Sequence, residues 1–239
     1  MNLRTLWDRR PVPHVLAALL AAAAGLWVFI MLSDSIGNGE LHTLDRTILL
    51  ALRNPADPSD PLGPRWFEEF MRDLTGLGGH GVLGLLLLAV ASFLLLAGLR
   101  RTAVSVLAAC LSGAVLSDLL KDFFSRPRPD LVPHAAYVLT PSFPSGHALL
   151  SALVYLTLAA LVTRQLKRRR LKLHVMTVAV LLTMLVGISR VYLGVHWPSD
   201  VLAGWAIGAA WALGWWGIAQ MLRPRARARP AEPGAAAEV

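Results

Sequence analysis

Six apolar segments, each close to the length of a membrane span, constrain the fold of this chain more than any other feature of its sequence. They cover residues 14–33, 79–99, 102–120, 148–163, 173–189 and 201–222. Five of them contain no Asp, Glu, Lys or Arg, and the third carries only Asp118, near its end. Because a helix needs about 20 apolar residues to cross the ~30 Å hydrocarbon core, we expect polar end residues to complete the shorter fourth and fifth segments. The sequence therefore predicts an all-α integral membrane protein with a bundle of six transmembrane helices.

The composition of the 239-residue chain excludes other broad classes of protein. Charged residues make up 16% of it, against about 25% in a typical soluble domain. Hydrophobic residues make up 55%, which excludes a disordered chain, and the single Cys110 excludes a disulfide scaffold. We expect Cys110 to be a small apolar residue within the third span. The spans predict one membrane domain over residues 1–222, followed by a disordered tail rich in Pro, Ala and Arg over residues 223–239.

Positive charge is distributed unevenly between the two sides of the membrane that six spans define. The termini and the loops after the second and fourth spans share one side and hold 15 Lys and Arg, against 8 on the other side. Because Lys and Arg are retained in the cytoplasm, we expect a protein of the cytoplasmic membrane with both termini inside. The net charge of +8 is thus divided among short loops beside the membrane, which argues against nucleic-acid binding. The eight residues on the outer side are Arg46, Arg53, Arg65, Arg72, Lys121, Arg126, Arg128 and Arg190.

Two segments near the N-terminus each have two interpretations. The first apolar segment follows Arg4, Arg9 and Arg10 as a signal peptide would, but it is longer than the usual ~7–15 residues of a signal core, so we expect a retained span. The loop over residues 34–78 contains an amphipathic stretch at residues 64–74. This stretch predicts a short helix that either lies at the outer membrane interface or caps the bundle.

Three clusters of polar residues fall in or beside the outward loops. They are Lys121 to Pro129, Pro144-Ser-Gly-His147, and Ser189 to Asp200. Ionisable residues at membrane depth are costly and usually functional. Since the three clusters share one side of the membrane, we expect them to form one site.

The cations of these clusters predict that the site binds an anion. Lys121, Arg128 and Arg190 come from separate segments. Arg suits bidentate contact with phosphate, and Lys supplies a point charge. Ser145 and Gly146 immediately precede the fourth span, where the N–H groups of a helix start attract an anion, and Gly146 lets the backbone approach closely.

Two histidines and one carboxylate can supply the chemistry. Asp200 follows His196 by four residues, a spacing that places both on one face of a helix, and Pro198 suits the first turn of the sixth span. A carboxylate bound to one ring nitrogen leaves the other nitrogen free as a nucleophile or base. His147 then remains available as a general acid.

The clusters resemble the motifs of the type 2 phosphatidic acid phosphatase (PAP2) family, the lipid phosphate phosphatases that share a superfamily with the vanadium haloperoxidases. The family motifs K-x6-R-P, P-S-G-H and S-R-x5-H-x3-D read here as Lys121 to Arg128-Pro129, Pro144 to His147, and Ser189-Arg190 through His196 to Asp200. All three match in residue type, spacing and order. The motifs span residues 121–200, and the six-span plan extends the resemblance to most of the chain, apart from the first loop and the tail.

The resemblance implies a phosphatase that acts on a lipid-linked phosphate or diphosphate, such as phosphatidic acid, phosphatidylglycerol phosphate or undecaprenyl diphosphate. It implies that His196 attacks phosphorus and forms a phosphohistidine, that Asp200 orients His196, and that His147 protonates the leaving oxygen and later helps to activate water. The residues expected to hold the phosphoryl oxygens are Lys121, Arg128, Ser145, Gly146 and Arg190. The resemblance implies no cofactor and no metal, and the sequence lacks a carboxylate-rich cluster that would hold Mg²⁺. The site would face the exterior.

Three rival functions use the same residues differently. A phosphotransferase would pass the phosphoryl group to an acceptor other than water. A haloperoxidase would bind vanadate in the anion pocket, but six spans argue against it. A nonenzymatic phospholipid-binding or transport protein would not need His147, His196 and Asp200, and all three are present.

Several residues near the motifs each have two interpretations. Arg126 is either a phosphate or headgroup contact or a loop charge, and Asp118 either pairs with Lys121 or faces water. Ser189 either forms a hydrogen bond near the site or packs. Gly204 and Gly208 form a small-residue pair that serves either tight packing within the bundle or a homodimer contact. The histidines that lack charged partners, and that we expect not to be catalytic, are His14, His42, His80, His134 and His174.

Overall fold

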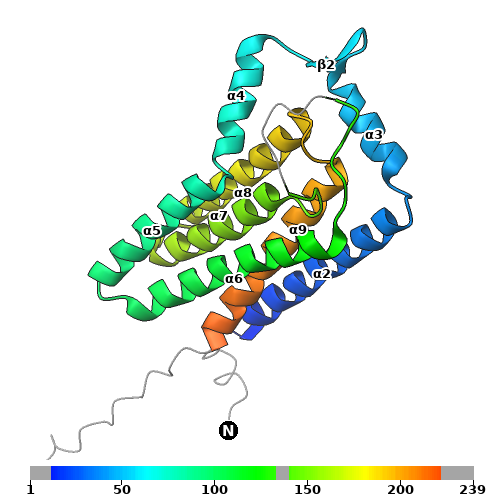
Figure 1. Ribbon diagram of the computed structural model, residues 1–239. Helices are drawn as coiled ribbons and strands as arrows, with labels where there is room; N and C mark the ends of the chain where they lie inside the picture. The colour runs from blue at the N-terminus through cyan, green and yellow to red at the C-terminus, as the bar shows by residue number, and fades with distance from the viewer. Residues whose placement is uncertain (1–11, 133–139, 222–239) are drawn as a thin grey trace, which may run out of the picture.

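Helices dominate the structure, a computed structural model that describes residues 12–132 and 140–221 (Figure 1). The elements in chain order are α2 (Val12–Gly37), α3 (His42–Ala51), β1 (Arg53–Asn54), β2 (Asp57–Pro61), α4 (Arg65–Gly76), α5 (His80–Leu96), α6 (Arg100–Phe124), α7 (Gly146–Gln165), α8 (Arg169–Tyr192) and α9 (Pro198–Met221). The expectations about the C-terminal tail and His134 concern residues outside these ranges.

Five helices, namely α2, α6, α7, α8 and α9, are long and apolar enough to cross a membrane. Helix α5 has 17 residues, so it spans only about 26 Å at 1.5 Å per residue, less than a hydrocarbon core. It passes as a span only together with α4, to which it is joined at a bend of 46°. The protein is therefore a multi-pass membrane protein built mainly of helices, and its described residues contain five candidate spans, or six if the bent pair counts as one.

Helix α7 is the most deeply packed span. Half of the residues in its most apolar 18-residue stretch are buried, whereas 17% of the residues in the corresponding stretch of α2 are buried. Helix α7 packs against α6, α8 and α9. Helix α2 lies along α9 (Figure 1). The core between the spans contains Phe29, Cys110, Leu149 and Ile207, so Cys110 is the buried apolar residue that the sequence predicted.

Small residues on α9 allow its close approach to α7. A Cβ atom at Gly208 would lie 2.3 Å from the carbonyl oxygen of Leu149, and one at Gly204 would lie 2.7 Å from that of Ser145. Glycine is therefore required at both positions for the two backbones to touch. Of the two interpretations of this pair, packing within the chain is observed at both glycines.

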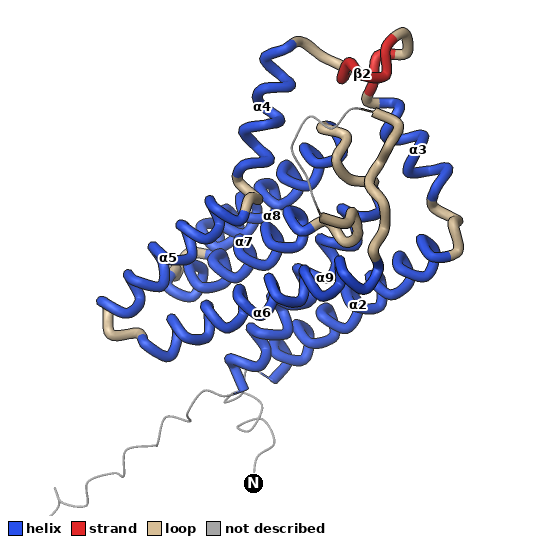
Figure 2. The backbone as a smooth tube through the Cα atoms, viewed as in Figure 1, coloured by secondary structure: helices blue, strands red, loops and turns tan. Residues whose placement is uncertain are grey.

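The loop after α2, over residues 38–64, contains more structure than the sequence predicted. Helix α3, the short antiparallel hairpin of β1 and β2, and α4 gather at one end of the bundle, beside the loop that follows α6 (Figure 2). The hairpin departs from the all-α expectation because strands this short show no alternating pattern. The buried Arg53 anchors it by donating a 2.7 Å hydrogen bond to the carbonyl oxygen of Tyr192 at the end of α8.

Helix α4 forms where the amphipathic stretch predicted it. Met71 and Leu74 are buried against Tyr192, Leu193 and Val195, so one face of α4 packs on the end of α8. The opposite face leaves aromatic rings exposed. The structure thus shows the contact with the bundle that one interpretation required.

Candidate active site

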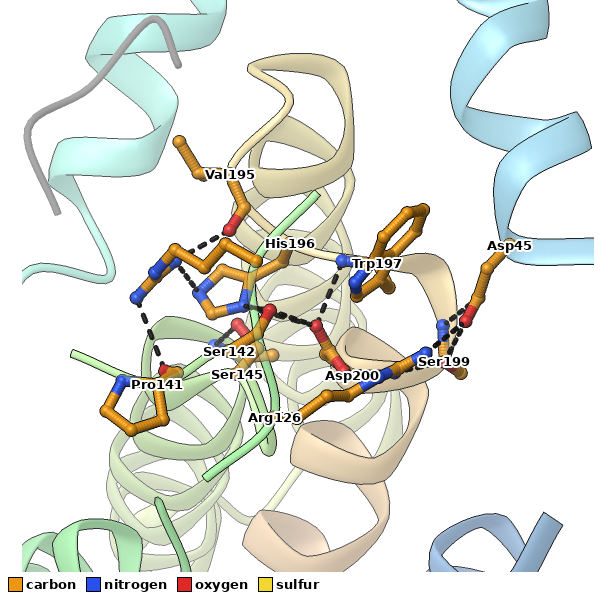
Figure 3. A network of polar contacts seen from close by, with 12 residues as sticks. Asp45, Arg126, Pro141, Ser142, Ser145, Val195, His196, Trp197, Ser199 and Asp200 are labelled. Carbon is orange, nitrogen blue, oxygen red and sulfur yellow. Dashed lines mark hydrogen bonds and ion pairs between the residues drawn. The ribbon is translucent and has the colours of Figure 1, made fainter. Parts of the chain in front are cut away.

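The three sequence clusters meet at the end of the bundle that carries α3 and α4 (Figures 1 and 3). Lys121 lies in the last turn of α6, and Ser145 caps α7 by accepting a hydrogen bond from the N–H of Ala148. Arg190 lies in the last turn of α8, and Asp200 in the first turn of α9. His196 lies in the short connection between α8 and α9, so ends of four helices surround it.

The side chain of His196 is buried between a guanidinium and a carboxylate. Its Nε2 lies 3.1 Å from Nη1 of Arg128, and its Nδ1 lies 3.6 Å from Oδ2 of Asp200 (Figure 3). A guanidinium can only donate, so Nε2 is the acceptor and the ring proton is on Nδ1, toward Asp200. This tautomer leaves the lone pair of Nε2 free for attack once Arg128 moves away.

Ser142 completes the link between His196 and Asp200. Its hydroxyl donates a hydrogen bond to Oδ2 of Asp200 and lies 3.3 Å from Nδ1 of His196. The backbone N–H of Trp197 donates to the same carboxylate oxygen at 3.0 Å. Because both Ser142 and Asp200 are fully buried, these bonds hold Oδ2 of the carboxylate toward the imidazole.

Burial lowers the pKa of His196 well below its ordinary value, and the positive charges of Arg190, Arg128 and Lys121 lower it further. Both effects disfavour the imidazolium form. At neutral pH His196 is therefore a neutral imidazole. This is the form that can act as a nucleophile.

Three cations, Lys121, Arg128 and Arg190, lie near the buried imidazole. Lys121 donates a 2.8 Å hydrogen bond to the carbonyl oxygen of Pro141, and Arg128 donates to those of Thr140 and Val195 at 2.8 and 2.6 Å. Burial is the main reason that the pKa of Arg128 is lowered. Among the described residues, none of the three cations forms a salt bridge with a carboxylate.

Arg190 has a donor available for a ligand. Its Nη1 donates to Oγ1 of Thr75 on α4 at 3.0 Å, while its buried Nε has no hydrogen-bond partner within residues 12–132 and 140–221. An unpartnered buried donor is uncommon in native proteins and marks a place for an acceptor. With Lys121 and Arg128, this donor makes the site suited to an anion.

The start of α7 differs from the sequence prediction in one detail. The N–H of Ser145 donates to the carbonyl oxygen of Asp200 at 3.0 Å, so it is not directed at an anion as expected. The first backbone hydrogen bond within α7 runs from the N–H of Leu149 to the carbonyl oxygen of Ser145. The N–H groups of Gly146 and His147 come before it, so they have no acceptor within the helix. A Cβ atom at Gly146 would lie 3.3 Å from Cε of Lys121, a tight contact that would displace the lysine side chain slightly.

His147 is half-buried beside a residue that sequence reasoning set aside. The rings of His147 and His80 are perpendicular, with their centroids 6.3 Å apart. His80 begins α5, and Gly78 before it packs directly against α8 and His147. The proximity of His80 to the site comes from this fold of the chain, and no spacing in the sequence signals it.

Asp118, Ser189 and Arg126 each had two interpretations from the sequence. Asp118 is exposed, and Ser189 donates a 2.7 Å hydrogen bond to the carbonyl oxygen of Val186 in its own helix, which is a packing role. Arg126 matches neither of its interpretations, because its guanidinium pairs with Asp200 and Asp45. Asp45 and Ser142 were not among the predicted site residues.

The arrangement combines a neutral, buried imidazole with a carboxylate on one side and, on the other, cations that form no salt bridge with any carboxylate in the described ranges. Such a site can bind a phosphoryl group and stabilise the charge that develops as it is transferred. No three His, Cys, Asp or Glu side chains converge as metal ligands in the described part of the chain.

Comparison with known proteins agrees with this geometry. The chain is 32% identical over 186 residues to phosphatidylglycerophosphatase B of Bacillus subtilis, covering 75% of this chain and 85% of that protein. It is 30% identical over 115 residues to undecaprenyl-diphosphatase of Sulfolobus acidocaldarius, covering 46% and 52%. A crystal structure of a transmembrane PAP2-type phosphatidylglycerolphosphate phosphatase from Bacillus subtilis superposes with a TM-score of 0.75 at 28% identity, covering 86% of this chain and 98% of that one.

These relatives are all phosphatases or diphosphatases by name. The family model for the PAP2 superfamily matches residues 101–224, which include every motif residue from Lys121 to Asp200. With a match over half of the chain and a relative aligned over most of its length, this chain belongs to the PAP2 superfamily.

Proposed function

We propose that this protein is a membrane-embedded lipid phosphate phosphatase that works through a phosphohistidine at His196. The observation that carries the proposal is the environment of His196, whose Nε2 faces cations while its Nδ1 faces Ser142 and Asp200. The substrate is a lipid-linked phosphate monoester or diphosphate. The names of the relatives support this class, since they include a phosphatidylglycerophosphatase, an undecaprenyl-diphosphatase and a lipid A 1-phosphatase.

In the first half of the reaction, Nε2 of His196 attacks phosphorus and the bond from phosphorus to the lipid oxygen breaks. His147 donates a proton to that oxygen. Asp200 stabilises the positive ring through Nδ1. Lys121, Arg128 and Arg190 stabilise the charge on the phosphoryl oxygens, which requires Arg128 to exchange its contact with Nε2 for a contact with the substrate.

In the second half, water attacks the phosphohistidine and the bond from nitrogen to phosphorus breaks. His147, now neutral, accepts a proton from the water. Inorganic phosphate leaves, and His196 returns to its neutral form. These steps use side chains alone, so we propose that the reaction needs neither a metal ion nor a cofactor.

We also propose six spans in one membrane domain, with α4 and α5 together forming the second span. Both termini then lie in the cytoplasm, and the site faces the exterior. The charge distribution supports this orientation, since the loop between α7 and α8 carries Lys167, Arg168 and further basic residues at the end away from the site. A site at the outer surface would act on lipids of the outer leaflet.

The proposal is tested with the purified protein in detergent micelles. Phosphate release is measured for phosphatidylglycerol phosphate, phosphatidic acid and undecaprenyl diphosphate, and kcat/KM is compared. We expect His196→Gln to abolish release from all three lipids, while His174→Gln, a change of an exposed histidine on α8, leaves it unchanged. Turnover by His196→Gln at the normal rate would exclude the proposed mechanism.

The same assay separates hydrolysis from transfer. A hydrolase releases one inorganic phosphate for each lipid consumed, whether or not an alcohol acceptor is present. A phosphotransferase would instead form a phosphorylated acceptor in proportion to the acceptor added. We expect the first result.

A further inference from the structure

Arg126 lies between two carboxylates from distant parts of the chain. Its Nη1 is 2.5 Å from Oδ1 of Asp200 and 2.9 Å from Oγ of Ser199, and its Nη2 is 2.9 Å from Oδ2 of Asp45 (Figure 3). The side chains of Asp45 and Asp200 are 2% and 0% exposed, so Arg126 compensates two carboxylates that water does not reach. Because both terminal nitrogens are occupied in this way, Arg126 is not oriented to hold a phosphoryl group.

Asp45 also caps the helix that carries Asp200. Its Oδ1 accepts a 2.9 Å hydrogen bond from the N–H of Ser199, and its Oδ2 accepts one from the hydroxyl of Ser199 at 2.5 Å. Pro198, the first residue of α9, has no N–H, so Ser199 provides the first donor of the helix. An N-cap normally comes from the residue just before a helix. Here a residue of α3, more than a hundred positions away in the sequence, supplies it.

Apolar packing holds Asp45 in this position. Leu49, one turn further along α3, is fully buried in a cluster with Val191, Trp197 and Val201. The guanidinium of Arg126 lies 5.6 Å from the ring centre of Trp197, within the range of a cation–π contact. Helix α3 is thereby docked against the loop that carries His196 and the start of α9.

The two oxygens of Asp200 consequently have different partners. Oδ1 is bound by Arg126, whereas Oδ2 accepts hydrogen bonds from Ser142 and from the N–H of Trp197 and faces Nδ1 of His196. If Arg126 were lost, the carboxylate could rotate about its Cβ–Cγ bond and turn away from the imidazole. A misplaced orienting group slows the chemical step and does not weaken substrate binding.

We propose that Arg126 and Asp45 are positioning residues for the reaction at His196, through which helix α3 of the first outward loop sets the orientation of the catalytic carboxylate. This inference rests on the proposed function, since it concerns the same imidazole. It gives the first loop, which lies outside the three motifs, a part in the reaction. Neither residue contacts the reacting atoms.

The test measures formation of the phosphoenzyme in a rapid-quench experiment with p-nitrophenyl phosphate, stopped in alkali because a phosphohistidine is labile to acid. The initial slope of phosphoenzyme formation per folded molecule gives the rate constant of the chemical step, and the substrate concentration at half of the maximal slope reports binding. For Arg126→Gln and Asp45→Asn we expect the rate constant to fall by about 10- to 100-fold, the range known for loss of an outer partner of a metal-bound histidine. The folded fraction, measured by size-exclusion chromatography in detergent, and the half-saturating concentration should stay near the wild-type values.

Two further variants strengthen the test. Arg126→Lys keeps the charge but reaches only one carboxylate, so its rate constant should lie between those of the wild type and Arg126→Gln. The double variant Asp45→Asn with Arg126→Gln should be no slower than the slower single variant, because both changes break the same network. Arg46→Gln, an exposed neighbour on α3, serves as the matched control and should match the wild type.

The outcomes separate the competing accounts. Wild-type rate constants with a smaller folded fraction would show a purely structural role, and a raised half-saturating concentration with an unchanged rate constant would show a phosphate contact; either result overturns the inference. If Arg126→Gln fails to insert, Arg126→Lys and Asp45→Asn carry the same comparison. Failure of the wild-type protein to form any phosphoenzyme would instead contradict the proposed function.

Discussion

Nη1 of Arg128 lies 3.1 Å from Nε2 of His196, so a cation covers the nitrogen that we propose to be the nucleophile. A phosphoryl group entering the site offers Arg128 a better acceptor than a neutral imidazole. Substrate binding would thus expose Nε2 at the moment when phosphorus is in reach. In the absence of substrate, the same contact helps to keep His196 unprotonated.

Removal of Arg128 should change the pH dependence of the reaction. Burial first, and then Arg190, Arg128 and Lys121, lower the pKa of His196, so the free base persists well below pH 6.5, the ordinary histidine value. As pH falls, kcat/KM for the wild type should decline through protonation of His196 only far below that value. In Arg128→Gln one positive charge is lost, the pKa of His196 rises, and this decline should begin at higher pH.

The measurement is the pH profile of kcat/KM for both proteins on the same substrate, so that ionisation of the substrate contributes equally. A profile of Arg128→Gln that declines at the same pH as the wild type would show that Arg128 does not influence the nucleophile.

Ser142 should matter more than its place outside the motifs suggests. Replacing it by Ala removes the hydroxyl that joins Asp200 to His196, and we expect kcat to fall by about 10- to 100-fold with little change in KM. Ser189→Ala is the matched control, because that hydroxyl donates to the carbonyl oxygen of Val186 in its own helix. Equal activity of the two variants in a phosphate-release assay would argue against a role for Ser142.

The contact between α7 and α9 predicts a difference in stability between two glycines of one helix. Gly208→Ala places a Cβ atom 2.3 Å from the carbonyl oxygen of Leu149, and overpacking of this kind costs about 1–3 kcal/mol. Gly214→Ala meets nothing within 4 Å, and the better helix propensity of Ala should make it neutral or slightly stabilising. Thermal unfolding in detergent should give a lower Tm for Gly208→Ala only, and equal values would contradict this packing.

The proposed orientation can be checked by labelling intact cells with a maleimide that does not cross membranes. Cys110 is buried, so single cysteines placed elsewhere report on their own positions. Ser59→Cys, in the exposed hairpin of the first outward loop, should react, whereas Lys167→Cys, between α7 and α8, should react only after the cells are broken. The reverse pattern would invert the topology.

Activity should survive chelation of divalent metals. The proposed steps use only His196, His147, Asp200 and the surrounding cations, so EDTA should leave kcat unchanged in a phosphate-release assay. Loss of activity with EDTA, followed by recovery on adding Mg²⁺, would require a different mechanism.

The parts of this structure that could be predicted from sequence are those that depend on local pattern. Long uncharged segments predicted the spans, and the spacing of Lys121, Arg128, His196 and Asp200 predicted residues that the fold brings together at one end of the bundle. The boundary of the second span was harder to predict, because α5 is short and becomes long enough only with α4 across a bend.

The contacts that could not be predicted join residues far apart in the chain. Asp45 is one acid in a polar loop, and nothing in its neighbourhood signals that it will cap α9. Arg126 lies inside the first motif, where we expected either a phosphate or headgroup contact or a loop charge, but tertiary packing directs it to two carboxylates. Such pairings depend on where α3 docks, which no local periodicity encodes.

The most direct test of the account is to locate the phosphoryl group during turnover. The protein is mixed with substrate, quenched in alkali and digested with trypsin, and its peptides are analysed by mass spectrometry. Cleavage after Arg164 and Arg190 places His147 and His196 on different peptides, so the site is assigned without ambiguity. The account predicts a phosphoryl group on the peptide that contains His196, and its absence from His196→Gln. A phosphoryl group on another residue, or full turnover with no phosphorylated peptide, would contradict it.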